Sequence, residues 1–418
     1  MKKQTLLINP WIYDFAAYDF GIKPLGLLRI ASRLRQNSAV SFVDCLSGCA
    51  RSKMPSGFSK LKKVRVETPS VLGQIKRPYF RYGISIDNFK NRLSCVNRPS
   101  QIYITSGMTY WYQGVKLAIR ILRELFPGVP ITLGGIYATL CFEHATLFSG
   151  ADEVHRGDYL TGDLEGEFPA YDLLEERDVL PIRTSKGCPF RCSYCASAVL
   201  NGEFAQRDPV GVFEELMYCR KEFGTRTFVF YDDALFHEAH TGIKKLLRII
   251  EASGERFNFY TPNGLHARFI DEEIAHLLRR TGFSDLRLSL ETSDEKIQEA
   301  TGSKVDNSDI ERSIILLKEA GFEKKDIGVY ILTGAPWISI DATKEDILYV
   351  NSLGAKAVLA SYSPIPLTRD YEELLGSGII KSNLDPLWHN KAIFSDKLMP
   401  GMADEIQDLR RFAARINS

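Results

Sequence analysis

Residues 181–197, PIRTSKGCPFRCSYCAS, join a candidate β-strand at 181–185 to a loop that carries three cysteines. The loop places Cys188, Cys192 and Cys195 in C-x-x-x-C-x-x-C spacing. The chain has eight cysteines in 418 residues, which is too few for a disulfide scaffold. With so few cysteines, three of them within eight residues are not expected by chance. The spacing therefore indicates that the loop binds a metal or a cluster.

The number of thiols favours iron and sulfur over zinc. Three thiolates can hold three irons of a 4Fe-4S cube and leave the fourth iron open, whereas a structural zinc site needs a fourth protein ligand. No His or Cys closely follows Cys195, and the next cysteine, Cys219, lies in a predicted helix. We therefore expect a 4Fe-4S cluster on Cys188, Cys192 and Cys195.

A series of candidate strands continues beyond the loop, separated by helical patterns in which Asp271 and Asp309 are placed as N-caps. The strands are expected at 181–185, 226–231, 257–261, 286–290, 327–332 and 357–362. This alternation predicts a partial (β/α)6 barrel of the TIM type over 181–370, with its chemistry at the carboxyl ends of the strands. Residues 371–418 are expected to form a helical tail.

The cysteine loop resembles the signature of the radical S-adenosylmethionine (radical SAM) superfamily. The spacing, the aromatic Tyr194 before the third cysteine and the place after the first barrel strand all match. The resemblance implies that the open iron binds SAM and that one electron from the cluster cleaves a carbon–sulfur bond of SAM. The 5′-deoxyadenosyl radical then takes a hydrogen atom from a substrate. An external one-electron donor of flavodoxin or ferredoxin type is also implied, and no catalytic residue beyond the cluster is indicated.

The same resemblance suggests SAM contacts at the strand ends. The family's usual Gly-Gly-Glu is absent after the second strand, where Asp232 and Asp233 stand as substitutes, and Glu291 resembles the family's acidic residue near SAM. The expected SAM-binding residues are Tyr194, Asp232, Asp233, Asn263, Glu291, Thr333 and Gly334. An acidic residue after a strand is also a common helix N-cap, and Gly334 also suits a plain turn.

The first 160 residues alternate in the same way and predict a doubly wound, Rossmann-like parallel sheet. Its strands are expected at 5–9, 41–44, 101–106, 131–135 and 152–155. A basic insertion at 51–98 interrupts the pattern, with eleven Lys and Arg against two acidic residues between Arg51 and Arg92. It is either a solvated excursion or a grip on a phosphate-bearing ligand. Residues 161–180 are acidic, carry Gly and Pro, and are expected to be a linker.

A doubly wound domain before such a barrel resembles the cobalamin-binding radical SAM enzymes. The matching stretches are PLGLLRIASRL from Pro24, TSGMTYWY at 105–112 and LGGIYATL at 133–140. The expected cobalamin-binding residues are Pro24, Gly26, Ser106, Gly134, Gly135 and Thr139. The D-x-H-x-x-G motif that supplies a cobalt ligand in the mutases is absent, so cobalamin would bind without a His ligand, or the domain has lost the cofactor.

We expect a radical SAM enzyme that uses cobalamin to methylate or rearrange an unactivated carbon of a small-molecule or natural-product-like substrate. The alternative is a methylthiotransferase-like RNA-modifying enzyme without cobalamin, in which the basic insertion grips RNA. Its second cluster would use the first-domain cysteines, namely Cys45, Cys49, Cys95 and Cys141. A third hypothesis is a non-catalytic cobalamin or SAM sensor, against which the complete cysteine triad argues.

Composition limits the partners and the compartment. The formal charge is +1, so no global field recruits nucleic acid or an anionic membrane. We expect no secretory signal at the N-terminus, because Asn9, Pro10 and Asp14 break its apolar run, and no transmembrane helix, because no stretch is apolar enough. We expect a cytoplasmic protein with neither a membrane nor a nucleic-acid partner.

Overall fold

The chain folds as two units in the computed structural model, which describes residues 3–19, 21–48, 50–53, 59–159, 166–398 and 401–418. The first unit comprises Met1–Arg177 and Ser382–Asn390, and the second comprises Asp178–Lys381 and Lys391–Ser418. The expected helical tail is thus shared, because nine of its residues, 382–390, belong to the first unit.

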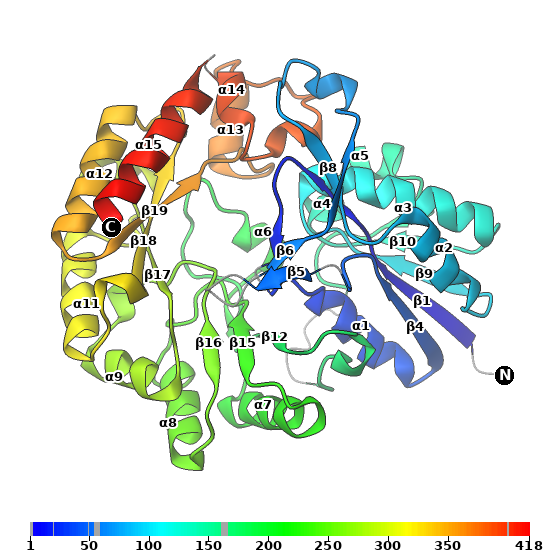
Figure 1. Ribbon diagram of the computed structural model, residues 1–418, viewed down its shortest axis with the longest axis horizontal. Helices are drawn as coiled ribbons and strands as arrows, with labels where there is room; N and C mark the ends of the chain where they lie inside the picture. The colour runs from blue at the N-terminus through cyan, green and yellow to red at the C-terminus, as the bar shows by residue number, and fades with distance from the viewer. Residues whose placement is uncertain (1–2, 20, 49, 54–58, 160–165, 399–400) are drawn as a thin grey trace. The chain divides into compact units, whose positions relative to one another are not determined.

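The first unit is built on a five-stranded parallel sheet of order β11-β10-β9-β1-β4 (Figure 1). Its strands are β1 (Lys3–Asn9), β4 (Ser38–Asp44), β9 (Gln101–Ile104), β10 (Ile131–Leu133) and β11 (Glu153–Val154). The chain leaves β1 for β4 on one side and returns to β9 on the other. The switch point therefore lies between β1 and β9, where doubly wound sheets bind ligands.

Helices cover this sheet through their apolar faces, as the periodicity predicts. They are α1 (Leu25–Arg35), α3 (Tyr112–Leu125), α4 (Ile136–Leu140) and α5 (Phe142–Phe148). On α3, Val115, Ala118 and Leu122 are fully buried, in agreement with their 3.6-residue spacing. The expected doubly wound architecture of the first unit is confirmed.

The basic insertion forms antiparallel strands rather than α/β units. Two small sheets have the orders β2-β8-β7 and β3-β6-β5. Their elements are β2 (Ile12–Asp14), β3 (Tyr18–Asp19), β5 (Ala50–Lys53), β6 (Ser59–Leu61), β7 (Lys63–Val66), β8 (Tyr79–Tyr82) and the following α2 (Ile86–Ser94). Part of the positive charge lies over aromatic rings: the Lys63 ammonium is 3.9 Å from the centre of the Phe80 ring. Residues 54–58 of the insertion lie outside the described residues.

The expected linker, residues 161–180, is divided between the two units: its residues 166–177 belong to the first unit and pack on α1, whereas residues 178–180 belong to the second. Ala170 and Leu174 are buried, and Ala170 shares a hydrophobic cluster with Leu27 and Ala31 of α1. The Ser32 hydroxyl donates to the Phe168 carbonyl at 2.6 Å. The apolar residues of PAYDLL explain why this stretch docks on α1, whereas residues 160–165 lie outside the described residues.

The second unit arranges six parallel strands in an arc with helices on the outside (Figure 1). The strands are β12 (Val179–Ile182), β15 (Thr227–Phe230), β16 (Asn258–Tyr260), β17 (Leu286–Glu291), β18 (Ile327–Thr333) and β19 (Lys356–Ser361). β12-β15-β16 and β17-β18-β19 pair as triplets, and the parallel bridges Phe259–Phe283 and Leu265–Leu288 join the two triplets. This is the expected partial barrel.

The outer layer consists of the crossover helices and the C-terminal helices. They are α7 (Pro209–Phe223), α8 (Ile243–Ser253), α9 (Glu272–Thr281), α10 (Glu295–Thr301), α11 (Asn307–Glu319), α12 (Ile340–Ser352), α13 (Arg369–Gly376), α14 (Phe394–Leu398) and α15 (Met402–Asn417). Asp271 caps α9 as expected, but α11 begins earlier, because Asp306 is its N-cap and Asp309 completes the capping box. The Asn417 side chain forms two 2.9 Å hydrogen bonds with the Ala357 backbone and thereby covers the edge strand β19.

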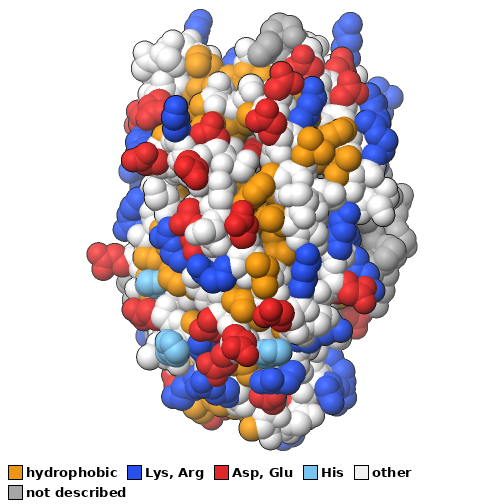
Figure 2. Space-filling view, turned by 90° about the vertical axis from the view of Figure 1, so that its left-hand side faces the viewer, with side chains coloured by type: hydrophobic (Ala, Val, Ile, Leu, Met, Phe, Trp, Pro, Cys, Tyr) orange, Lys and Arg blue, Asp and Glu red, His pale blue; other side chains and the backbone are white. Residues whose placement is uncertain are grey.

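Acidic and basic side chains alternate over the outer helices of the barrel (Figure 2). That face shows no patch of a single sign, which agrees with the nearly neutral composition. Among the described residues, no helix has both the length and the apolar character needed to cross a membrane.

Candidate functional site

The cysteine loop begins directly after β12 and is anchored by a short hairpin. β13 (Ser185–Lys186) pairs antiparallel with β14 (Ala205–Gln206), and Gly187 follows with φ of +72°. A Cβ on Gly187 would lie 2.5 Å from the Glu203 carbonyl oxygen, so only glycine fits here. The turn at Gly187 therefore fixes where the cysteine loop begins, at Cys188.

The three thiols differ in exposure, and none forms a disulfide. Cys188 is buried, Cys192 is half-buried and Cys195 is exposed. Burial raises the pKa of Cys188 to about 11, so a metal must displace its proton on binding. The Ser197 amide donates to the Cys195 sulfur at 3.5 Å, which is a contact that stabilises a thiolate.

This donor set fits a 4Fe-4S cube. Each of three thiolates binds a different iron in a cube, so the sulfurs need not converge on one point. Among the described residues, no group of three His, Cys, Asp or Glu side chains is gathered as a single metal ion would require. The expected cluster ligands are thus Cys188, Cys192 and Cys195.

A second loop, Thr301–Asp306 between α10 and α11, contacts the backbone of the cysteine loop and is called the brace here. The Ser193 amide donates to the Thr301 carbonyl at 3.0 Å. Gly302 has φ of +119°, and a Cβ on it would lie 3.2 Å from the Arg191 carbonyl oxygen and from the Cα of Cys192. The close approach of the two backbones thus depends on this glycine.

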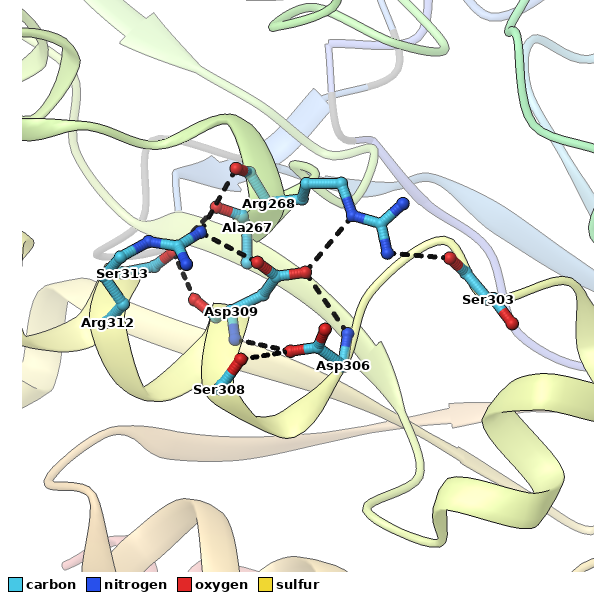
Figure 3. A network of polar contacts seen from close by, with 8 residues as sticks. All are labelled: Ala267, Arg268, Ser303, Asp306, Ser308, Asp309, Arg312 and Ser313. Carbon is cyan, nitrogen blue, oxygen red and sulfur yellow. Dashed lines mark hydrogen bonds and ion pairs between the residues drawn. The ribbon is translucent and has the colours of Figure 1, made fainter.

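The brace is held in turn by Arg268, which lies in the short turn η4 (Ala267–Phe269) (Figure 3). Its guanidinium donates to the Ser303 carbonyl at 2.9 Å and to the Asp309 carboxylate at 3.2 Å. Ser303 has φ of +48°, an uncommon conformation for a residue with a side chain. Such a conformation persists only where surrounding groups hold it. Here Arg268 holds it, by bonding both to the Ser303 carbonyl and to Asp309 of α11.

Asp232 anchors the start of the cysteine loop. Its buried carboxylate accepts hydrogen bonds from the Thr184 amide, from the Thr184 hydroxyl at 2.7 Å and from the Ser185 hydroxyl at 2.7 Å. Burial raises the pKa of Asp232 and these donors oppose the rise. Protein donors therefore surround the carboxylate that the sequence suggests for SAM.

Replacement of Asp232 by Asn should destabilise the second unit by about 1–3 kcal/mol and reduce the iron bound. The reason is that an amide leaves one buried donor facing a second donor. Thermal unfolding and iron analysis would measure the two effects. Asp233→Asn is the matched control, since the half-buried Asp233 accepts one hydrogen bond, from Asn201, and should lose about 0.5 kcal/mol or less. Equal losses in both variants would contradict the anchoring role.

Asp233 and Asn263 lie at neighbouring strand ends. The Asp233 carboxylate accepts from the Asn201 amide at 2.7 Å, and Asn201 ends α6 (Ser197–Asn201), directly after the cysteine loop. The Asn263 side chain donates to the Asp232 carbonyl at 3.0 Å. The structure thus brings both residues near the cysteine loop, while the Asn263 carbonyl oxygen and one Asp233 oxygen stay outside these bonds.

Glu291 ends β17 in a left-handed conformation, with φ of +73° and a register shift between Ser289 and Glu291. Non-glycine residues at positive φ cost about 1–3 kcal/mol and gather at functional sites. Its carboxylate accepts from the Lys304 ammonium at 2.6 Å. Lys304 in turn lies 5.5 Å from the centre of the Tyr194 ring, so Glu291 and Tyr194 belong to one group. Lys304 is not predictable from the sequence, because no pattern marks a lysine thirteen residues beyond Glu291 as its partner.

Thr333 and Gly334 end β18. The Thr333 side chain is fully buried, and its hydroxyl has no hydrogen-bond partner. Gly334 has φ of +76°, and a Cβ on it would lie 2.9 Å from Ile406 of α15. Helix packing therefore accounts for Gly334, whereas the Thr333 hydroxyl stays available to a ligand.

Other buried hydroxyls near the strand ends and on the cysteine loop also lack partners. Together with Thr333, which is 0% exposed, they include the hydroxyls of Ser193 and Thr261, in residues that are 4% and 3% exposed. Buried polar groups are nearly always satisfied, so unpartnered ones call for a ligand or water. A polar cofactor such as SAM at this end of the barrel fits these atoms.

In the first unit, four of the expected cobalamin residues lie together at the ends of β9 and β10. The Ser106 hydroxyl donates to the Gly134 carbonyl at 3.0 Å and accepts from the Tyr137 amide. A Cβ on Gly135, whose φ is +92°, would meet the Ser106 backbone at 2.5 Å. The Thr139 hydroxyl donates to the Gly135 carbonyl at 2.9 Å.

Two glycines at this end of the sheet face open space. Nothing lies within 4 Å of a Cβ built on Gly134 or on Gly26, which lies in the first turn of α1, two residues after its N-cap Pro24. Space beside a strand end at the edge where doubly wound sheets bind ligands fits a bulky cofactor. These six residues accordingly remain the candidate set.

The segment Ser382–Asn390 supplies contacts to the first unit that the sequence analysis did not anticipate. The Tyr112 hydroxyl donates to the Asp385 carboxylate at 3.1 Å, and the Asn390 amide donates to the buried Asp14 carboxylate at 2.8 Å. His144 bonds to the Tyr137 hydroxyl at 2.7 Å, and burial lowers the pKa of His144. His144 is thus a packing residue here, and Tyr112, the last residue of TYWY, packs against it with 4.9 Å between ring centres.

Comparison with known families identifies a similarity of the barrel to one superfamily. Residues 182–347 match the model of the Radical SAM superfamily. The matched segment begins at the end of β12 and reaches into α12, and it contains the cysteine loop, the brace and Glu291.

Two solved structures share the two-unit architecture. TsrM from Kitasatospora setae, a radical SAM methyltransferase solved with cobalamin and a [4Fe-4S] cluster, has a TM-score of 0.65 at 16% identity and covers 90% of this chain and 78% of its own. OxsB, a cobalamin-dependent SAM radical enzyme, has a TM-score of 0.54 at 14% identity and covers 90% of this chain and 56% of its own. At these identities the likeness establishes the fold.

Curated relatives cover less of the chain. An uncharacterized methyltransferase of Synechocystis is 33% identical over 140 residues, which are 32% of this chain and 26% of the relative. One of Pyrococcus horikoshii is 24% identical over 250 residues, which are 55% of this chain and 52% of the relative. This chain therefore spans about a quarter to a half of the length of these relatives.

Proposed function

From the radical SAM domain that residues 182–347 form, we propose that this protein is a cobalamin-using radical SAM enzyme that methylates or rearranges an unactivated carbon of a small molecule. The observation that carries the proposal is the braced loop that presents Cys188, Cys192 and Cys195 at the strand ends of a partial barrel. The substrate class is small-molecule or natural-product-like, and the electron comes from an external donor of flavodoxin or ferredoxin type.

Cys188, Cys192 and Cys195 would hold the 4Fe-4S cluster. When bound, the cluster supplies the electron that cleaves SAM reductively. The chain's own part is to present the three sulfurs, to exclude water and to orient SAM. For orientation we propose Tyr194, Asp233, Asn263, Glu291 and Thr333.

Asp232 and Gly334 take different roles in this proposal. The Asp232 carboxylate is surrounded by donors from Thr184 and Ser185, so it positions the cysteine loop rather than SAM. Gly334 lets the chain turn beneath α15 and approaches a cofactor only through its backbone.

The first unit would bind cobalamin at the ends of β9 and β10. Support comes from the open space at Gly134 and Gly26 and from the architecture shared with two structures solved with cobalamin. No described residue reproduces the His of the mutase motif, because β4 ends at Asp44 and the sequence continues Cys45, Leu46 and Ser47. Cobalamin would then bind without a His ligand from that position.

Metal content per chain tests the proposal. The protein is reconstituted anaerobically with iron, sulfide and hydroxocobalamin and then desalted. About four irons and one cobalt are expected. Four irons without cobalt would remove the cobalamin part, and fewer than about one iron would overturn the radical SAM assignment.

The RNA-modifying alternative gains no comparable support. The two structures compared above were solved with cobalamin, which that alternative lacks. Its second cluster would use Cys45, Cys95 and Cys141, which are buried, exposed and half-buried, together with Cys49, which lies outside the described residues. Salt-dependent retention on RNA would revive it.

A further inference from the structure

Lys304 forms a shielded ion pair beside the cysteine loop. Its ammonium lies 2.6 Å from the Glu291 carboxylate, and the two side chains are only 12% and 14% exposed. Among exposed pairs on this chain, Lys325 and Glu323 have similar geometry, at 2.8 Å, but are 68% and 69% exposed. Solvent screens the exposed pair, whereas the charges of the shielded pair act on their neighbours.

The ion pair of Lys304 and Glu291 lies beside the cysteine loop. The Lys304 ammonium lies over the ring of Tyr194, which stands between Cys192 and Cys195 in the chain. Tyr194 stacks on Trp337, with 6.5 Å between ring centres, and the Trp337 indole donates to Asp370 at 3.2 Å. The Lys304 ammonium and its partner, the Glu291 carboxylate, therefore lie beside the segment that joins Cys192 to Cys195.

The backbone fixes this arrangement. Lys304 lies two residues after Gly302, where a Cβ would come within 3.2 Å of the Cα of Cys192. It lies one residue after Ser303, whose carbonyl accepts a hydrogen bond from Arg268 (Figure 3). Lys304 therefore cannot move away from the cysteine loop unless the hydrogen bonds of Ser193 to Thr301 and of Arg268 to Ser303 are lost. Glu291 is held from the other side by the left-handed end of β17.

We propose that Lys304 is a positioning residue that holds Glu291 beside the cysteine loop and, with it, sets the reduction potential of the bound cluster. The inference rests on the proposed function, because it requires the 4Fe-4S cluster. Reduction adds one negative charge to the cluster, so a nearby ammonium favours the reduced form and a nearby carboxylate opposes it. The two charges of the pair act in opposite directions on the potential.

The pair therefore predicts a pattern of opposite shifts. Lys304→Met leaves the Glu291 carboxylate unbalanced, and the midpoint potential should become more negative. Glu291→Gln leaves the ammonium unbalanced, and the potential should become more positive. The double variant removes both charges and should return close to the unmodified protein, and Lys304→Arg, which keeps the charge, should also stay close.

The experiment is a redox titration of the reconstituted cluster without SAM, followed by electron paramagnetic resonance at about pH 8.5, where an unpaired carboxyl stays ionised. Each variant is compared at equal iron content. Lys325→Met, which removes the exposed lysine on the same unit, is the matched control and should leave the potential unchanged.

Opposite shifts with compensation in the double variant would support the proposal, since a merely structural role would not change sign with the charge removed. Unshifted potentials in fully loaded Lys304→Met and Glu291→Gln would overturn it. If Lys304→Met does not fold, the sign of the Glu291→Gln shift decides. Absence of iron in the unmodified protein would instead overturn the proposed function.

Discussion

Cys192→Ala should bind almost no 4Fe-4S cluster and should lose reductive SAM cleavage entirely. A cube held by two protein sulfurs exposes two irons instead of one, so it is held less tightly and is lost more readily. Iron content should fall from about four per chain to background. Iron analysis and detection of 5′-deoxyadenosine after chemical reduction would measure both losses.

Cys95→Ala is the control for this variant. Cys95 is exposed at the end of α2 in the first unit, and its sulfur contacts the Asn91 carbonyl at 3.5 Å. Iron and SAM cleavage should be unchanged in it. Retention of SAM cleavage in Cys192→Ala would contradict the cluster assignment, and loss of iron in Cys95→Ala would point to a second cluster in the first unit.

Gly134→Leu should abolish cobalamin retention and leave the iron unchanged. A Cβ on Gly134 would meet no protein atom within 4 Å, and the φ of Gly134 is not in the left-handed region, so a side chain can begin here without a backbone clash. The same side chain would occupy the space proposed for cobalamin. Affinity should fall more than tenfold, or by more than about 1.4 kcal/mol, in a titration followed by the cobalamin absorption spectrum.

Gly376→Leu is the matched control, because Gly376 also faces open space without a left-handed φ and ends α13 in the second unit. Cobalt retention should be unaffected in it. Equal cobalt content in Gly134→Leu and the unmodified protein would contradict binding at the ends of β9 and β10. An unchanged melting temperature in Gly134→Leu would show that the loss does not arise from misfolding.

The elements that the sequence predicted well depend on local signals. The spacing of Cys188, Cys192 and Cys195 is read directly, and the alternation of strands with helices such as α3 fixes a parallel sheet and a partial barrel. The match to the Radical SAM superfamily confirms this interpretation over 182–347. Helix starts were less exact, since α11 begins at Asn307 under the Asp306 cap, before Asp309.

What the sequence did not predict depends on contacts between distant residues. Asp232 meets Thr184 across 48 residues, and only the barrel reveals that protein donors surround this carboxylate. The strained Glu291 and its partner Lys304 meet through a loop that a glycine, Gly302, lets approach. Neither hydrophobic periodicity nor residue spacing predicts these long-range contacts, because they form only when the strands assemble into the barrel.

The membership of Ser382–Asn390 in the first unit bears on how the chain is made. The donor Asn390 leaves the ribosome 376 residues after Asp14, whose carboxylate accepts its hydrogen bond. Until then one bond to a buried carboxylate is missing, and Tyr112 lacks Asp385. The N-terminal unit thus reaches its final state only after the whole barrel has been synthesised, so the two units cannot be produced as independent halves by cutting the gene after residue 177.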